Sequence, residues 1–224
     1  MALIELPDLI QGTDEWHDQR RGIVTASVVG RLLTSTRKVA SNDTSRALLA
    51  QLVAERITGW TDPAFVSDDM LRGHDDEPRA LQAYVDRTGV EVEAIGFMVR
   101  DDWGFEIGYS PDGLVGEQGL VEVKSRRAKK QLQTIVDDEV PAENMAQLQC
   151  GLLVSGREWI DYASYCGGMP LYVKRVEPDP EWFEAIVAAV TSFELAASLM
   201  TEQYEAAVAG LPVTERYVEL EMVI

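Results

Sequence analysis

The sequence predicts an α/β (α+β) protein in which helices flank a central, mixed and mostly antiparallel sheet. Helical periodicity dominates the chain up to Gly89, an alternation of period two follows, and the remainder mixes both patterns. The 224 residues are 46% hydrophobic and 26% charged, which fits a globular protein that can bury a core. No linker rich in proline, glycine or serine divides the chain, so we expect one domain over residues 1–224.

Four helices are expected in the first part of the chain. Thr13 can cap the first, whose acidic residues precede its basic ones in the order that the helix dipole favours. Leucines recur at helical spacing in the third, and a proline suits the first turn of the fourth. The expected ranges are 14–21, 25–34, 44–58 and from Glu77-Pro78 to Gly89, with a polar, mobile loop after the second helix.

Strands are expected after Gly89. In "WGFEIGYS", large apolar residues alternate with small or polar ones, and "GEQG" is a good hairpin turn between two short strands. A helix between Pro141 and Gly156 and a last helix capped by Asp179 complete the pattern. The expected strands are 90–100, 103–110, 114–115, 120–124, 159–166 and 171–176.

Composition limits the function classes. The net charge of −18 argues against non-specific coating of nucleic acid, although a local basic track such as Arg20–Arg21 or the cluster 124–130 could still bind a backbone. Two isolated cysteines, Cys150 and Cys166, predict free thiols. The N-terminus lacks the features of a signal peptide and apolar stretches fall short of a membrane span, so we expect a cytoplasmic protein.

The segment "SPDGLVGEQGLVEVKSRR", residues 110–127, contains the strongest candidate site. Residues two apart in a strand share a face, so Glu122 and Lys124 point together while Val121 and Val123 point into the core. Asp112 ends the preceding strand, across the hairpin. The two carboxylates and a main-chain carbonyl at position 123 suit Mg²⁺, and the lysine could orient or acidify a water. Taken piecemeal, the alternative is a turn aspartate and a solvated sheet face.

The combination of these residues resembles the PD-(D/E)xK nuclease signature. Three further segments, in the same order along the chain, resemble motifs of the lambda-type phage exonuclease (YqaJ-like viral recombinase) family within that superfamily. They are "DEWHDQRRGIVTAS" (14–27), "RGHDDEPRALQAY" (72–84) and "NMAQLQCGLLVSG" (144–156). The resemblance extends from Asp14 to Val176 and implies a restriction-endonuclease-like core.

The resemblance also implies roles for particular residues. The catalytic set would be Asp112, Glu122, Lys124, Glu77 and Gln147, and the metal ligands would be Asp112, Glu122, Glu77 and the carbonyl of Val123. The terminal 5′ phosphate of DNA would be held by Arg20, Thr25, Ser27 and Ser110, where a helix N-terminus and a guanidinium also suit an anion. Without the family, Glu77 would be a first-turn carboxylate and Gln147 an ordinary polar residue.

The implied activity is a Mg²⁺-dependent exonuclease, with Mn²⁺ as a substitute metal, that degrades the 5′-ended strand of linear double-stranded DNA. A homotrimeric ring, a single-strand-annealing recombinase as partner and a bacterial host cytoplasm are also implied. We expect residues 126–130 to line the DNA channel, Trp16 and Ile23 to lie in the core, and neither His17 nor His74 to bind metal. The alternatives are another endonuclease of this superfamily and a catalytically silent protein that binds DNA ends.

Overall fold

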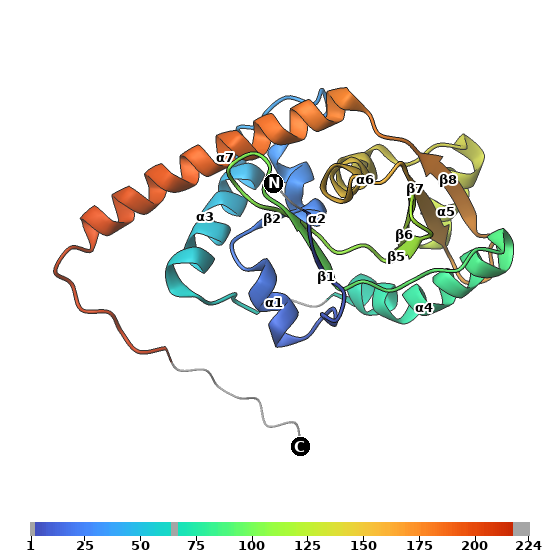
Figure 1. Cartoon of the computed structure of the whole chain (residues 1–224), viewed down its shortest axis with the longest axis horizontal. Coiled ribbons are helices and arrows are strands. Elements are labelled where there is room, and N and C mark those ends of the chain that lie inside the picture. The colour runs from blue at the N-terminus through green and yellow to red at the C-terminus, as the bar shows by residue number, and fades with distance from the viewer. Residues whose placement is uncertain (1–2, 64–66, 217–224) are drawn as a thin grey trace, which may run out of the picture.

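The computed structural model describes residues 3–63 and 67–216 (Figure 1). Its strands form two four-stranded sheets, with the orders β1-β3-β4-β2 and β5-β6-β7-β8. The elements are β1 (Leu3–Leu6), α1 (Asp14–Arg20), β2 (Val24–Thr25), α2 (Ala26–Val29), a 3-10 helix (Gly30–Leu32), α3 (Asp43–Thr58), α4 (Asp68–Thr88), β3 (Phe97–Arg100), β4 (Ile107–Tyr109), β5 (Gly113–Val115), β6 (Gly119–Ser125), α5 (Ala128–Asp137), α6 (Ala142–Ser155), β7 (Trp159–Tyr165), β8 (Tyr172–Val176) and α7 (Pro180–Ala207).

Strand pairing confirms the predicted mixed, mostly antiparallel class. Four pairs are antiparallel, namely β1–β3, β3–β4, β5–β6 and β7–β8. The pairs β2–β4 and β6–β7 are parallel. A parallel pair needs a long crossover connection, and α5 and α6 supply it between β6 and β7.

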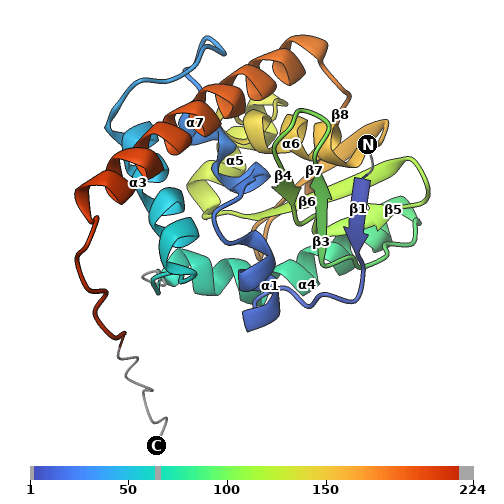
Figure 2. The same ribbon diagram turned by 60° about the vertical axis from the view of Figure 1, so that its left-hand side comes forward.

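The second sheet is covered on both faces (Figures 1 and 2). On one face, Val121 and Val123 of β6 pack with Ala80 and Tyr84 of α4, as the alternating pattern predicts. On the other, α6 contacts β7 and also reaches β3 and β4 of the first sheet. Helix α6 therefore joins the two sheets and lies over the face of the second sheet opposite to α4.

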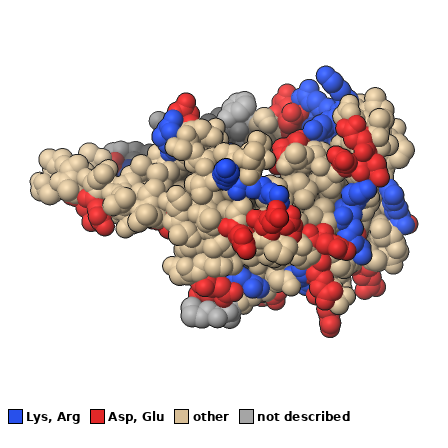
Figure 3. Space-filling view, turned by 90° about the horizontal axis from the view of Figure 1, so that it is seen from above, with Lys and Arg blue, Asp and Glu red and all other residues tan. Residues whose placement is uncertain are grey.

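Helix α7 packs against α3 and α6, and its C-terminal half extends beyond the body of the molecule (Figures 1 and 2). Its buried face includes Ile186, Val190 and Phe193. Contrary to the sequence expectation, this helix is long and apolar enough to cross a membrane by length and composition, and 28% of its most apolar window is buried. The protruding end of the molecule is largely free of charged side chains (Figure 3).

One helix begins earlier than predicted. Helix α4 starts at Asp68, not near Glu77, and Pro78 lies in its interior. The start follows from the Ser67 side chain, which accepts a hydrogen bond from the Met70 amide, and from two aspartates in the first turn. The predicted end is confirmed, because Gly89 adopts the left-handed conformation that terminates the helix.

Other boundaries also differ from the predictions. The expected strand 90–100 is reduced to β3 at its C-terminal end. The expected strand 103–110 is reduced to β4, because the chain turns at Gly104, where φ is +80°. The expected helix 25–34 is divided into α2 and a 3-10 turn. Helix α5 and strands β1 and β2 were not predicted. Helix α5 was not predicted because its lysines and glutamines, which lie among its apolar residues, were interpreted as part of a basic surface cluster.

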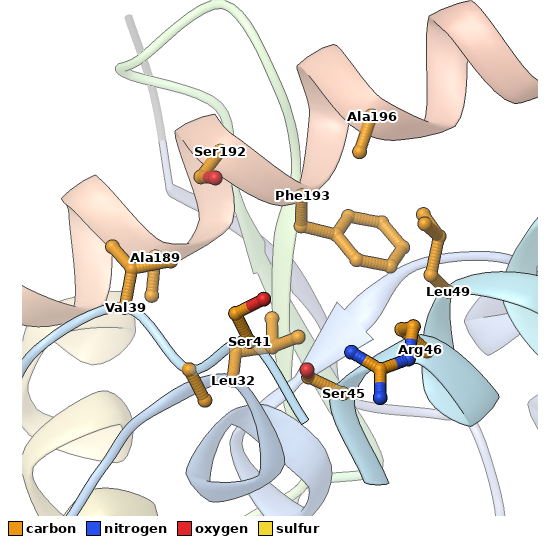
Figure 4. Close-up of a pocket in the computed structure, with 11 residues that line it drawn as sticks. Leu32, Val39, Ser41, Ser45, Arg46, Leu49, Ala189, Ser192, Phe193 and Ala196 are labelled. Atoms are coloured by element: carbon orange, nitrogen blue, oxygen red, sulfur yellow. The ribbon is translucent and has the colours of Figure 1, made fainter. Parts of the chain in front are cut away.

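A small cavity of about 130 Å³ lies between α3, α7 and the segment that precedes α3 (Figure 4). Apolar side chains such as Leu49 and Phe193 line it together with Ser41, Ser45 and Arg46. None of its lining residues belongs to the predicted site.

Candidate active site

The hairpin β5–β6 brings Asp112 next to the middle of β6. Gly113 pairs with Val121 in this antiparallel hairpin, so Asp112, one residue earlier, lies beside Glu122 and Val123. The Asp112 Oδ2 atom accepts a hydrogen bond from the Val123 amide at 2.6 Å. Because the N–H and C=O groups of a strand residue point to the same edge, the Val123 carbonyl lies on the edge that Asp112 occupies.

Glu122 is enclosed between β6 and α6, with only 1% of its surface exposed. Its Oε1 atom accepts hydrogen bonds from the Lys124 ammonium, at 2.6 Å, and from the side-chain amide of Gln147 on α6. Its Oε2 atom accepts one from the Tyr109 hydroxyl at 3.1 Å. Glu122 and Lys124 therefore share a face, as the period of two predicts, and this face is not a solvated one.

Burial and like charge disfavour ionisation of the acidic residues in this cluster. Burial, and next the Glu122 carboxylate, raise the pKa of Asp112 well above its usual value, against the opposing effect of Lys124. Burial also raises the pKa of Glu77, which interacts electrostatically with His74, Glu122 and Lys124. The five predicted catalytic residues thus lie in one cluster formed by α4, β6, α6 and the turn before β5.

The pKa of Lys124 is also raised, which favours its charged form. Burial lowers the pKa of its ammonium, but the neighbouring Glu122 and Asp112 carboxylates raise it by more, so the net pKa lies above the usual lysine value. Lys124 therefore remains protonated at neutral pH.

The donor atoms of this cluster fit a hard divalent cation. In the described part of the chain, no three histidine, cysteine, aspartate or glutamate side chains are grouped as a ready metal site. Asp112 and Glu122 nevertheless provide carboxylate oxygens, and the Val123 carbonyl lies on the same edge as Asp112. Such oxygens suit Mg²⁺, which usually retains several waters. A cation there would offset the charge repulsion that raises the pKa of Asp112.

The four residues predicted to bind a 5′ phosphate form a second, adjoining cluster. The Arg20 Nη2 atom lies 3.4 Å from the Thr25 hydroxyl and 3.3 Å from the Ser27 hydroxyl. The Arg20 guanidinium also stacks 3.8 Å from the centre of the Trp16 ring, and the indole N–H donates to the Ser110 hydroxyl at 3.0 Å. Ser110 precedes Asp112 by two residues, so the two clusters are continuous.

The physical basis of this second cluster differs from the sequence argument. Helix α2 has only four residues, so its dipole contributes little, and Arg20 with the hydroxyls remains the basis for anion binding. Burial lowers the pKa of Arg20 to about 10, with Glu55 opposing this effect, so Arg20 is still charged at neutral pH.

Three residues near the clusters differ from the sequence predictions. Trp16 is half-buried and contacts Arg20 and Ser110, so its assignment to the core was wrong; Ile23 is likewise only half-buried. Tyr109 was predicted only as a strand residue, not as a site residue. The alternation in "IGY" turns Tyr109 inward three residues before Asp112, and this pattern could have indicated its contact with the site.

The basic cluster after Lys124 is largely engaged by partners. Arg127 pairs with Asp69 at 2.7 Å, and Lys130 pairs with Glu143 at 2.7 Å. Arg126 donates to the Asn144 side chain at 2.7 Å. Lys129 is exposed, and no ion pair involves it within residues 3–63 and 67–216. Their predicted role in a DNA channel stays a prediction.

Comparison with known structures is consistent with this geometry. The chain resembles an alkaline exonuclease (LHK-Exo) from Laribacter hongkongensis with 29% identity and a TM-score of 0.80, over 89% of this chain and 100% of that one. The same enzyme in complex with dAMP matches equally well. A phage-related exonuclease from Haemophilus somnus 129PT shares the fold, with a TM-score of 0.56 at 14% identity, over 81% of this chain and 96% of that one. No curated protein sequence matches the chain.

The sequence also matches a family model. The match to the YqaJ-like viral recombinase domain extends over residues 15–158, which is more than half of the chain. This range contains both clusters described above, including the three elements and the turn that form the first of them. The chain therefore belongs to the YqaJ-like viral recombinase family.

Proposed function

We propose that this chain is a metal-dependent deoxyribonuclease that degrades the 5′-ended strand of linear double-stranded DNA and leaves 3′ single-stranded tails for recombination by strand annealing. One observation carries the proposal: the cluster of Asp112, Glu122 and Lys124 adjoins the Arg20 cluster through the Trp16–Ser110 hydrogen bond. The family and the similarity to an alkaline exonuclease support a nuclease of this type.

The chemistry would be attack of water on a phosphodiester. A bound divalent cation, Mg²⁺ or in its place Mn²⁺, would neutralise phosphate charge and lower the pKa of a bound water. Asp112, Glu122 and the Val123 carbonyl would hold it, with Glu77 nearby. Lys124, protonated beside Glu122, would orient the attacking water and stabilise negative charge that develops on the phosphate. Gln147 would hold the Glu122 carboxylate in place.

The Arg20 cluster would set the direction of digestion. A guanidinium can grip a terminal phosphate with two hydrogen bonds, and the Thr25 and Ser27 hydroxyls lie 3.0 Å apart beside it. A terminal 5′ phosphate held there would lie next to the site where the first phosphodiester is cut. A homotrimeric ring, an annealing recombinase as partner and a bacterial cytoplasmic location complete the proposal, and they depend on the family resemblance.

The test is a comparison of three substrates. The protein is incubated with Mg²⁺ and linear duplex DNA with a 5′ phosphate, linear duplex without it, and covalently closed circles, each with a chelator control. We expect loss of the phosphorylated linear duplex, slower loss of the unphosphorylated one, and intact circles. Cleavage of closed circles would instead identify an endonuclease, and DNA binding without cleavage would identify a silent end-binding protein.

Arg20→Ala tests the direction-setting cluster separately. We expect it to reduce the rate advantage of the 5′-phosphorylated duplex over the unphosphorylated one by roughly tenfold, the effect of losing about 1.4 kcal/mol of binding. Arg31→Ala removes an exposed arginine outside both clusters and should leave the ratio unchanged. An unchanged ratio in Arg20→Ala would contradict the assignment.

A further inference from the structure

Tyr109 is built into the candidate site by the packing of α6. Its ring is 1% exposed at the end of β4. Opposite the ring, α6 carries Gly151, where an added Cβ would lie 2.7 Å from the Tyr109 Cζ atom. A side chain at position 151 would therefore displace the ring, and the glycine leaves the space that the phenol needs.

The Tyr109 hydroxyl donates to the Oε2 atom of Glu122, to which no other side chain among the described residues donates. Lys124 and Gln147 both donate to Oε1, and Tyr109 donates to Oε2 at 3.1 Å. These donors differ in kind. The lysine neutralises the carboxylate, whereas a phenol fixes the plane of the carboxylate and leaves its charge available.

We propose that Tyr109 is a positioning residue that orients the Glu122 carboxylate for a divalent cation. The inference rests on the metal site of the proposed function and adds a residue to it. Carboxylates that bind metals are held by further hydrogen bonds, and loss of such a partner typically weakens metal affinity by about ten- to a hundredfold. Tyr109 donates to Oε2 of Glu122 from β4, whereas Gln147 donates to Oε1 from α6.

The test is Tyr109→Phe, which removes the hydroxyl and keeps the ring. Binding of Mn²⁺ to the full chain without DNA is measured by titration calorimetry, alongside thermal unfolding. We expect the Mn²⁺ dissociation constant to rise about ten- to a hundredfold. Cleavage of linear duplex should need correspondingly more metal and should recover most of its rate at saturating metal.

Tyr84→Phe is the matched control. Its hydroxyl also donates to a buried carboxylate, Asp161, at 2.8 Å, but on the α4 side of the sheet. It should lower the melting temperature about as much as Tyr109→Phe does and leave Mn²⁺ binding unchanged. Gly151→Ala supplies a second variant that displaces the phenol while retaining it, and it should also weaken Mn²⁺ binding.

The outcomes separate this inference from the proposed function. Wild-type Mn²⁺ affinity in folded Tyr109→Phe would overturn the inference, as would equal weakening in Tyr84→Phe, which would indicate general loosening. If the wild-type chain neither binds Mn²⁺ nor cleaves linear DNA, the proposed function itself fails. Cleavage by the wild type with unchanged metal binding in Tyr109→Phe would leave the function intact and remove only the role of Tyr109.

Discussion

At the scale of residues, the buried carboxylate of Glu122 is the centre of the candidate site. Glutamate is rarely buried without partners, and here three donors from three different elements satisfy it. Asp112 is different, because within the described residues the Val123 main-chain amide is the only group that donates to it, and burial holds its pKa well above the usual value. The site therefore contains acidic groups whose charge the folded chain alone does not fully compensate.

The first residue-scale prediction concerns Lys124. Lys124→Ala should reduce cleavage of linear duplex by at least about a hundredfold, because it removes the positive charge beside Glu122 that would stabilise the transition state. Binding of duplex, measured with Ca²⁺ or a chelator to prevent cleavage, should be largely retained. Lys174→Ala, which removes a lysine paired with the exposed Asp138, serves as control and should cleave normally. Full activity in Lys124→Ala would rule out its proposed role.

A second residue-scale prediction concerns stability in the absence of metal. The raised pKa of Asp112 in the folded state means that the folded chain binds more protons than the unfolded one above the normal aspartate pKa of about 4, so stability falls as the pH rises toward the folded pKa. Asp112→Asn removes this loss. In a chelator, we expect the melting temperature of Asp112→Asn to exceed that of the wild type, by about 2–4 °C for each kcal/mol gained in the free energy of unfolding. The difference should be larger at pH 8 than at pH 4.

Thermal unfolding at both pH values measures this effect directly. Addition of Mg²⁺ should raise the melting temperature of the wild type and have little effect on Asp112→Asn. If Asp112→Asn is instead less stable than the wild type at pH 8 without metal, the folded chain stabilises the ionised Asp112 carboxylate, and the prediction is wrong.

At the scale of elements, α4 delivers Glu77 to the site from the middle of a helix. The Ser125 hydroxyl donates to Asp76 at 2.7 Å, and Arg72 donates to the same hydroxyl at 3.2 Å. Since Ser125 follows Lys124 on β6, these contacts fix the helix against the strand that carries Glu122 and Lys124. Glu77 is therefore not the first-turn carboxylate that its sequence position next to proline suggests.

Pro78 provides the element-scale prediction. It lies in the interior of α4, where it removes a main-chain hydrogen bond to residue 74 and crowds that carbonyl. Pro78→Ala should stabilise the protein by roughly 1–3 kcal/mol, measured by chemical or thermal unfolding. Arg79→Ala, at the adjacent exposed position, is the control and should change stability by less than about 0.5 kcal/mol. A decrease in stability on replacing Pro78 would mean that the ring makes favourable contacts.

At the scale of the whole molecule, the charge distribution limits how strongly DNA can be held. The net charge is −18, and on the face in Figure 3 acidic and basic side chains are interspersed. Several cations near the site are already paired, as Arg127 is with Asp69 and Lys130 with Glu143. Backbone binding should therefore depend on few basic side chains and respond strongly to the loss of any one of them.

The corresponding prediction is a change in salt dependence. Lys129→Ala should reduce the slope of log affinity for duplex DNA against log salt concentration by about 1, the value expected for one phosphate contact. Lys38→Ala removes an exposed lysine of the segment before α3 and should leave the slope unchanged. Equal slopes for Lys129→Ala and the wild type would place the DNA path elsewhere on the molecule.

The sequence by itself determined the features that depend on residues close together along the chain. Period two placed Glu122 and Lys124 on one face, caps at Thr13 and Asp179 marked two helices, and ordered motifs identified the family. These features depend on neighbours along the chain, so they can be read without a fold. The start of α4 was missed because the proline signal at position 78 outweighed the weaker capping signal of Ser67.

Only the tertiary structure decided which distant groups meet. It placed Tyr109 on the second oxygen of Glu122, Trp16 between Arg20 and Ser110, and Asp69 and Glu143 against the basic cluster. Apart from the contact of Trp16 with Arg20, which lies within α1, these contacts join residues from separate elements whose approach is set by packing, such as the close contact of α6 with β4 at Gly151. No periodicity within one segment encodes such an approach, because its energy comes from the burial of both partners together.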